Sequence, residues 1–198
     1  METLIPRANH DPGLRCRSVR HAGRIPRIVV TGSESTGKTT LAREIAAALR
    51  TVWVPEYSRT YAETIGVPLS AANVEPIAHG QIAAEDVAEP LANDVLILDT
   101  DLVSTTVYAE HYYGSCPPWI MVAARERLGD LYLLADIDLP WKADSVRDRP
   151  AARALVHQGF IDRLREFSAC VASVSGMEGD RLTTALDAIA LWKRSRCQ

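Results

Sequence analysis

One short stretch constrains the fold of this chain more than any other: residues 27–40, RIVVTGSESTGKTT. It opens with a β-branched apolar run at 28–30, which is typical of a buried strand. Residues 32–39 then match the phosphate-binding pattern G-x-x-x-x-G-K-[ST] at every required position. Residues 39–49 continue with apolar side chains at helical spacing. The stretch therefore predicts a strand–loop–helix unit with an anion site in its loop.

The chemistry of a triphosphate explains this spacing. Glycines allow a tight turn in which successive backbone N–H groups converge on an anion, and the helix that follows points its positive end at the same place. Lys38 can reach the β- and γ-phosphates, and the Thr39 hydroxyl can bind Mg²⁺. We therefore expect ATP and Mg²⁺ as cofactors, although the pattern does not exclude GTP. The expected phosphate-binding residues are Gly32, Ser33, Glu34, Ser35, Thr36, Gly37, Lys38, Thr39 and Thr40.

Composition narrows the function classes further. The 198 residues suit one domain with a sizeable core, and the net charge of −3 gives no general case for binding nucleic acid or membranes. No apolar run approaches the roughly 20 residues that span a bilayer, and we expect no secretory signal. The four scattered cysteines form no C-x-x-C pair, so we expect free thiols and a cytoplasmic location.

The first 26 residues differ from the rest of the chain. They contain five arginines, two acidic residues and three prolines, with little apolar periodicity. This arm is either a basic tail for an anionic partner or a poorly ordered extension. Because arginines without aromatic residues are a weak nucleic-acid signature, we favour the extension and place one domain at 27–198.

Strand and helix patterns alternate along that domain. The alternation predicts an α/β fold with five parallel strands and helices on both faces of the sheet. Beyond the opening unit, the expected strands are 52–54, 95–98, 131–134 and 170–174, and the expected helices are 74–92, 103–113, 119–128, 151–167 and 180–193.

Charged side chains follow two of these strands, where ligands bind in open α/β sheets. Glu56 and Arg59 can position or deprotonate an acceptor hydroxyl, or they form only a surface ion pair. Asp99 closes a buried apolar strand, which is the Walker B pattern for a carboxylate that serves Mg²⁺. Asp101 adds a second carboxylate within reach of the same site.

A long polar segment, residues 136–150, follows the fourth strand. Its Arg147 and Arg149 are similar to lid arginines, which stabilise charge on a transferring phosphoryl group. The alternative is an exposed loop in which Asp144 and Asp148 pair with them.

Four segments, 31–40, 55–59, 99–101 and 140–147, together resemble the ribosylnicotinamide (nicotinamide riboside) kinase family. The resemblance covers residues 27 to about 192. This part of the chain is similar to the kinase domain of a bacterial regulator of NAD biosynthesis, which typifies the family. It implies a P-loop NTPase fold like that of nucleoside monophosphate kinases, with sheet order 2-3-1-4-5 and a lid. It also implies ATP-dependent phosphorylation of the 5′-hydroxyl of nicotinamide riboside to nicotinamide mononucleotide.

That regulator also carries a helix-turn-helix region and an adenylyltransferase domain. The arm is too short for either, so we expect neither activity here. The expected partner is a small-molecule nucleoside, with no nucleic acid and no membrane, and the sequence leaves a homo-oligomer open.

The resemblance assigns roles to individual side chains. Glu56 is the first choice for accepting the hydroxyl proton, and Asp101 is the second choice or grips the ribose. Tyr57 or Trp141 would stack on the pyridinium ring through a cation–π contact. The expected catalytic residues are Lys38, Glu56, Asp101, Arg147 and Arg149; the expected substrate-binding residues are Glu56, Tyr57, Arg59, Asp101, Trp141 and Asp144; and the expected metal ligands are Thr39 and Asp99.

Two other functions stay open at this point. One is a P-loop kinase for another nucleoside or small molecule, and the other is a non-catalytic ATP-binding regulatory module. A GTPase switch would need an Asn-Lys-x-Asp motif to recognise the base, which this sequence lacks.

Overall fold

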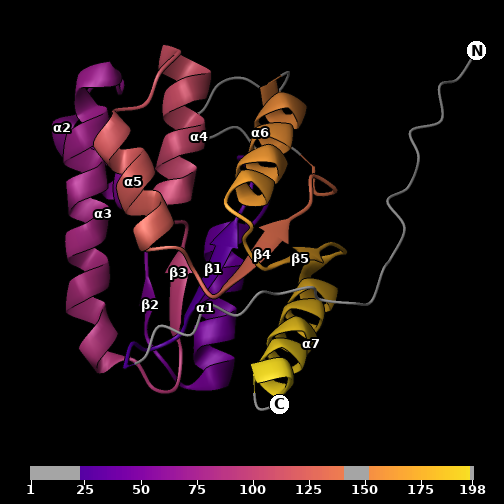
Figure 1. Cartoon of the computed structure of the whole chain (residues 1–198). Helices are drawn as coiled ribbons and strands as arrows, with labels where there is room; N and C mark the ends of the chain where they lie inside the picture. Colours follow the sequence, from indigo (N-terminus) through magenta and orange to yellow (C-terminus); the bar gives the residue numbers. More distant parts are fainter. Residues whose placement is uncertain (1–22, 141–151, 197–198) are drawn as a thin grey trace, which may run out of the picture.

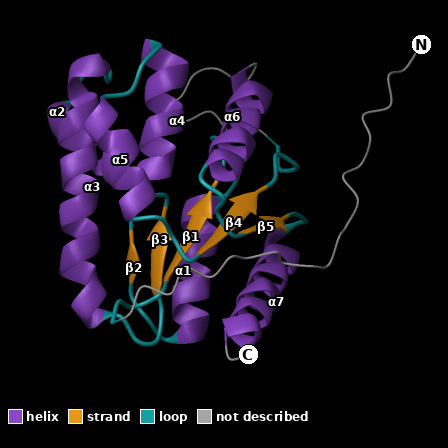
Figure 2. Cartoon of the chain, viewed as in Figure 1, coloured by secondary structure: helices purple, strands orange, loops and turns teal. Residues whose placement is uncertain are grey.

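A five-stranded parallel sheet lies at the centre of the molecule (Figures 1 and 2). The structure, a computed structural model, describes residues 23–140 and 152–196. The strand order is β2-β3-β1-β4-β5, which confirms the order expected from the sequence. The strands are β1 (Arg27–Thr31), β2 (Trp53–Val54), β3 (Leu96–Asp99), β4 (Leu131–Ala135) and β5 (Val171–Val174).

Helices connect the strands. They are α1 (Lys38–Leu49), α2 (Tyr57–Ile65), α3 (Val74–Ala88), α4 (Leu102–Tyr113), α5 (Pro118–Glu126), α6 (Arg153–Glu166) and α7 (Glu178–Arg196), with short 3₁₀ helices η1 (Ala71–Asn73) and η2 (Glu89–Leu91). Helix α3 ends at Ala88, before Pro90, because proline has no N–H with which to continue the helical hydrogen bonds. Within the described ranges, we find no helix that is both long enough and apolar enough to span a membrane.

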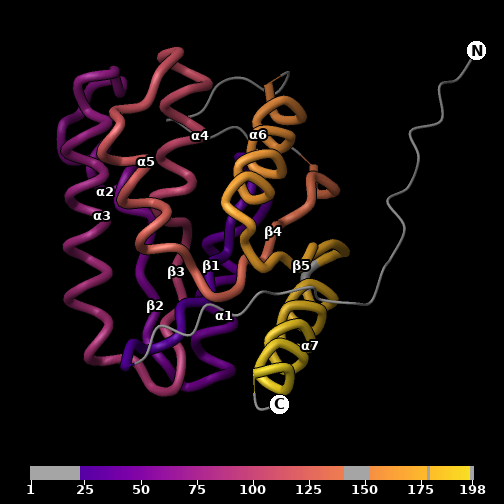
Figure 3. The backbone as a smooth tube through the Cα atoms, in the orientation of Figure 1, coloured from indigo at the N-terminus to yellow at the C-terminus, as the bar shows by residue number. Residues whose placement is uncertain are grey.

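Alternate residues of each strand face two separate cores. Val29, Leu98 and Tyr132 pack with side chains of α3 to α6, whereas Ile28 and Leu133 pack with α1 and α7. Figure 3 shows α1 and α7 on one side of the sheet and the other helices on the opposite side. Burial on both faces explains why the strands are apolar at nearly every position.

The apolar pattern of α6 predicts four inward side chains, and the structure agrees for Phe160 and Leu164 but not for Leu155. The pattern predicts Leu155 on the inward side, but this residue is 66% exposed. The buried positions are Val156, Phe160 and Leu164, which recur every four residues along one face.

Asp130 accepts hydrogen bonds from three segments at the edge of the sheet where β1 and β4 begin. Its Oδ2 accepts hydrogen bonds from Arg27 N at 2.9 Å and from the Arg24 guanidinium at 3.3 Å. Its Oδ1 accepts from Arg196 Nη1 at 2.8 Å. Arg24 of the expected arm therefore contacts the domain, and the first 22 residues of that arm lie outside the described part of the chain.

The two described cysteines differ. Cys116 is a free thiol, and burial raises its pKa to about 11. Cys170 is disulfide-bonded, so the expectation of free thiols is wrong for this residue.

Candidate active site

The phosphate-binding loop begins with a glycine that no other residue can replace without strain. Gly32 has φ 130°, and a Cβ there would lie 2.8 Å from the carbonyl oxygen of Ala135 on the neighbouring strand. Gly37 precedes α1 with φ 76°, and Ser35 between them has φ 55°. Three left-handed residues in one loop turn its N–H groups toward a common centre.

Side chains complete this anion nest. Lys38 Nζ donates to Ser33 O at 2.8 Å, and Thr36 Oγ1 donates to the same oxygen at 2.8 Å. The Ser33 hydroxyl is buried and has no hydrogen-bond partner among the described residues. Because an unsatisfied buried hydroxyl is costly, this loop suits a ligand that brings acceptor oxygens, as a phosphate does.

Oxygen ligands for a divalent cation meet beside the nest. Thr39 Oγ1 donates to Asp99 Oδ2 at 2.6 Å, and Asp99 ends β3 with 1% of its surface exposed. A hydroxyl and a carboxylate are hard ligands of the kind that Mg²⁺ prefers. The two residues expected as metal ligands are therefore adjacent and chemically suited to Mg²⁺.

Two arginines from distant helices hold the loop from outside. Arg153 donates to Ser35 O at 3.1 Å and to Leu139 O at 2.8 Å. Arg181 donates to Thr36 O at 2.8 Å and also pairs with Asp138. Sequence reasoning missed both arginines, because neither lies in a local motif.

The expected lid arginines, Arg147 and Arg149, lie outside the described residues, as do Trp141 and Asp144. What these four side chains contact stays a prediction.

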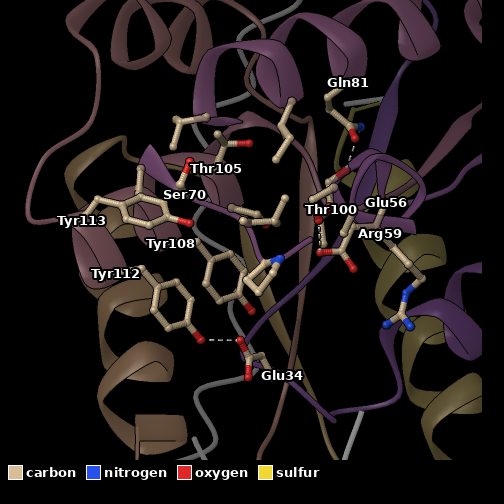
Figure 4. A pocket seen from close by; sticks show the side chains of 18 of the residues that line it. Glu34, Glu56, Arg59, Ser70, Gln81, Thr100, Thr105, Tyr108, Tyr112 and Tyr113 are labelled. Carbon is tan, nitrogen blue, oxygen red and sulfur yellow. Dashed lines mark hydrogen bonds between the residues drawn. The ribbon is translucent and has the colours of Figure 1, made fainter. Parts of the chain in front are cut away.

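A cavity of about 630 Å³ opens beside the loop (Figure 4). It is lined by residues from the loop itself, from the ends of β2 and β3, and from α2, α3 and α4. The structure brings four expected site residues together in it: Glu34, Glu56, Arg59 and Asp101.

The Glu34 side chain serves a different part of the site from the one expected. Although Glu34 belongs to the phosphate-binding loop, its carboxylate lines the cavity and accepts a hydrogen bond from Tyr112 OH at 2.6 Å (Figure 4). This direction has a physical reason, since a carboxylate in the nest would repel the phosphates.

Glu56 lies where β2 ends, on the cavity side. The residue is 7% exposed, and its Oε1 accepts a hydrogen bond from Ser58 Oγ at 2.9 Å. It lines the cavity together with Arg59. Glu56 is therefore a buried carboxylate that faces the cavity, and its role as proton acceptor stays a prediction.

Asp101 is the N-cap of α4. Its Oδ1 accepts from Val103 N at 3.0 Å, and its Oδ2 accepts from Tyr132 OH at 2.5 Å. Burial raises the pKa of Asp101 to about 7, although these two hydrogen bonds act in the opposite direction. With both oxygens bound by protein donors, Asp101 is suited to hold the cavity wall rather than to take a proton.

The aromatic side chains in the cavity are not the expected ones. The Tyr57 ring packs against Gly80 of α3, where a Cβ would lie 2.0 Å from it, and Tyr57 does not line the cavity. Tyr108, Tyr112 and Tyr113 do. The missed signal is the spacing of Tyr108 and Tyr112, which places both on one face of α4 with rings stacked 6.0 Å apart.

Comparisons with known proteins agree with this geometry. The trifunctional NAD biosynthesis/regulator protein NadR of Salmonella typhimurium is 30% identical over 176 residues, which cover 78% of this chain and 43% of that protein. A crystal structure of NadR protein in complex with NR superposes with a TM-score of 0.73 at 27% identity, covering 84% of this chain and 51% of that one. The chain spans less than half the length of the NadR relatives it matches.

A thymidylate kinase from Ehrlichia chaffeensis shares the fold. Its TM-score is 0.64 at 15% identity, over 86% of this chain and 99% of that one. The model of the AAA domain family matches residues 27–181, from the first strand to the arginine that holds the phosphate-binding loop. With its P-loop, its Walker B carboxylate and a sheet like that of nucleoside monophosphate kinases, the chain belongs to the AAA domain family.

Proposed function

We propose that the chain transfers the γ-phosphoryl group of ATP to the 5′-hydroxyl of nicotinamide riboside, giving nicotinamide mononucleotide. The observation that carries this proposal is the cavity that opens beside the phosphate-binding loop and is lined by carboxylates and tyrosines. The similarity to a NadR protein solved in complex with NR supports the choice of acceptor.

The charge of the cavity suits this acceptor. Nicotinamide riboside carries a cationic pyridinium ring and no phosphate. The carboxylates of Glu34 and Glu56 favour a cation, and the faces of Tyr108 and Tyr112 offer cation–π contacts worth about 0.5–2 kcal/mol. The same carboxylates repel an acceptor that already carries a phosphate.

Positioning supplies most of the rate enhancement in such transfers. The loop N–H groups and Lys38 hold the triphosphate, and Mg²⁺, held by Thr39 and Asp99, would neutralise charge that develops on it. Glu56 accepts the proton of the 5′-hydroxyl as that oxygen bonds to the γ-phosphorus. The bond from this phosphorus to the β,γ-bridging oxygen breaks, and ADP leaves. Arg147 and Arg149 would close over the transferred group as lid arginines.

ADP formation tests the proposal when measured with nicotinamide riboside, with adenosine, uridine or thymidine, and without an acceptor. We expect turnover to depend on nicotinamide riboside and the product to carry one phosphate on the 5′-oxygen. A faster reaction with another nucleoside would make the chain a kinase for that nucleoside. ATP binding without a phosphorylated product from any nucleoside would favour a non-catalytic regulatory module.

A further inference from the structure

Gln81 of α3 is a buried amide between the two strand ends that carry the acceptor-side carboxylates. It is 3% exposed and lines the cavity. In Figure 4 its side chain points toward Thr100, close to Glu56. None of the sequence motifs includes Gln81, and the chemistry proposed above assigns it no step.

The amide joins both strand ends through hydrogen bonds. Its Oε1 accepts from Tyr57 N, directly after Glu56, at 3.2 Å. Its Nε2 donates to Thr100 O, between Asp99 and Asp101, at 3.5 Å. Thr100 has φ 71°, a left-handed conformation that is strained for a β-branched residue and needs support from its surroundings.

A buried ion network fixes the orientation of the amide. Gln81 Nε2 also donates to Glu85 Oε1 at 3.1 Å, one turn further along α3. Glu85 Oε2 pairs with Arg27 at 2.9 Å and with Arg127 at 3.2 Å, and the side chains of Glu85 and Arg27 are each 2% exposed. Because Glu85 Oε1 and Thr100 O are both acceptors, the NH₂ end must face them and the oxygen must face Tyr57 N.

We infer that Gln81 is the positioning residue of the acceptor side, which fixes the distance between Glu56 and the end of β3. The inference rests on the proposed function, because Glu56 is the proton acceptor only if the cavity holds a nucleoside. A general base must lie within about 3.2 Å of the hydroxyl it deprotonates, so a small shift of the Glu56 loop is enough to lower the rate.

The test uses two variants of the full chain. Gln81→Met removes every hydrogen bond of the amide at similar volume. We expect kcat/KM for nicotinamide riboside to fall about 10- to 100-fold and KM for ATP to change less than about twofold. The matched control is Gln158→Met here and Gln158→Glu for the charged variant below, since Gln158 is exposed on α6, away from the cavity, and bonds only to Asp162 among the partners described.

Gln81→Glu adds a pH profile that a merely structural role would not produce. A protonated Glu at this position can still donate to Thr100 O and accept from Tyr57 N, but an ionised one places a second carboxylate against Glu85. The other charged and titratable side chains near this position are the same in the variant and in wild type: Arg27, Arg127, Asp101 and Tyr132. We therefore expect the activity ratio of Gln81→Glu to wild type to fall as the pH rises from about 6 to about 8, and the ratio for Gln158→Glu to stay flat.

The outcomes separate this inference from the proposed function. Wild-type protein that is inactive on nicotinamide riboside overturns the proposed function. Active wild type together with an unaffected Gln81→Met variant overturns only the role of Gln81. A loss that is equal for both substrates and constant with pH, with a lower melting temperature, would mean that Gln81 only stabilises the fold, which also overturns the inference.

Discussion

The phosphate side and the acceptor side of this site are built in different ways. The phosphate side is one continuous loop, residues 32–39, in which positive φ angles at Gly32, Ser35 and Gly37 set the backbone conformation. The acceptor side is a cavity lined by side chains from α2, α3, α4 and two strand ends, far apart along the chain. The comparison teaches that a local motif fixes where the phosphate lies, whereas tertiary packing decides what receives it.

Lys38→Ala gives the largest effect we expect, and it lies on the phosphate side. The substitution removes the ammonium group that reaches the β- and γ-phosphates, so turnover should fall below detection while the melting temperature stays close to wild type. Lys193→Ala is the control, because Lys193 lies near the C-terminal end of α7 and pairs with the exposed Asp94, outside the loop and the cavity. Near-normal kcat in Lys38→Ala would contradict the assignment of the phosphate side.

Glu56→Gln is the strongest test of the acceptor side. Loss of a general base lowers kcat by about 10²- to 10⁴-fold. Binding of ATP without nucleoside, followed by calorimetry, should stay normal because Glu56 lies on the other side of the site. The matching variant is Asp101→Asn, assayed at saturating nucleoside. If Asp101→Asn loses the rate and Glu56→Gln keeps it, the two roles must be exchanged.

Glu34→Gln and Tyr112→Phe test the boundary between the two sides. Glu34 belongs to the phosphate loop by sequence and to the cavity by geometry. Removing the Tyr112 hydroxyl should raise KM for nicotinamide riboside about 2- to 10-fold, with a larger rise for Glu34→Gln, since hydrogen bonds to charged groups are stronger. KM for ATP should not change. If only KM for ATP rises, Glu34 acts on the phosphate side instead.

The last prediction concerns stability rather than turnover, at Asp101. Its folded-state pKa of about 7 lies above the ordinary value of 3.8, so between these values the folded state binds more protons than the unfolded state. The contribution of Asp101 to the free energy of unfolding should therefore fall as the pH rises from about 4 to about 7. Asp101→Asn keeps an N-cap acceptor but cannot ionise, so its urea unfolding should lack this slope. Equal slopes would contradict the raised pKa.

The same contrast explains what the sequence could predict. The P-loop and the Thr39–Asp99 pair follow from local patterns, whereas the strand order is implied by the family resemblance, and the structure agrees with all three. Tyr57 was expected in the cavity because it follows a strand end, yet its ring fills the space above Gly80. No local sequence pattern predicts that packing or the hydrogen bond from Tyr112 to Glu34, because both depend on tertiary packing between distant segments.

Asp130 has a consequence for rearranging the chain. It binds Arg24 and Arg196, so both ends of the described domain meet at one carboxylate. That carboxylate lies where β1 and β4 begin, whereas the phosphate loop follows the end of β1. A short peptide could therefore join residue 196 to residue 24 in a circular permutant. Its new junction would lie on the edge of the sheet opposite the phosphate-binding loop. Reporter domains fused at either position would also leave the mouth of the cavity open to substrate.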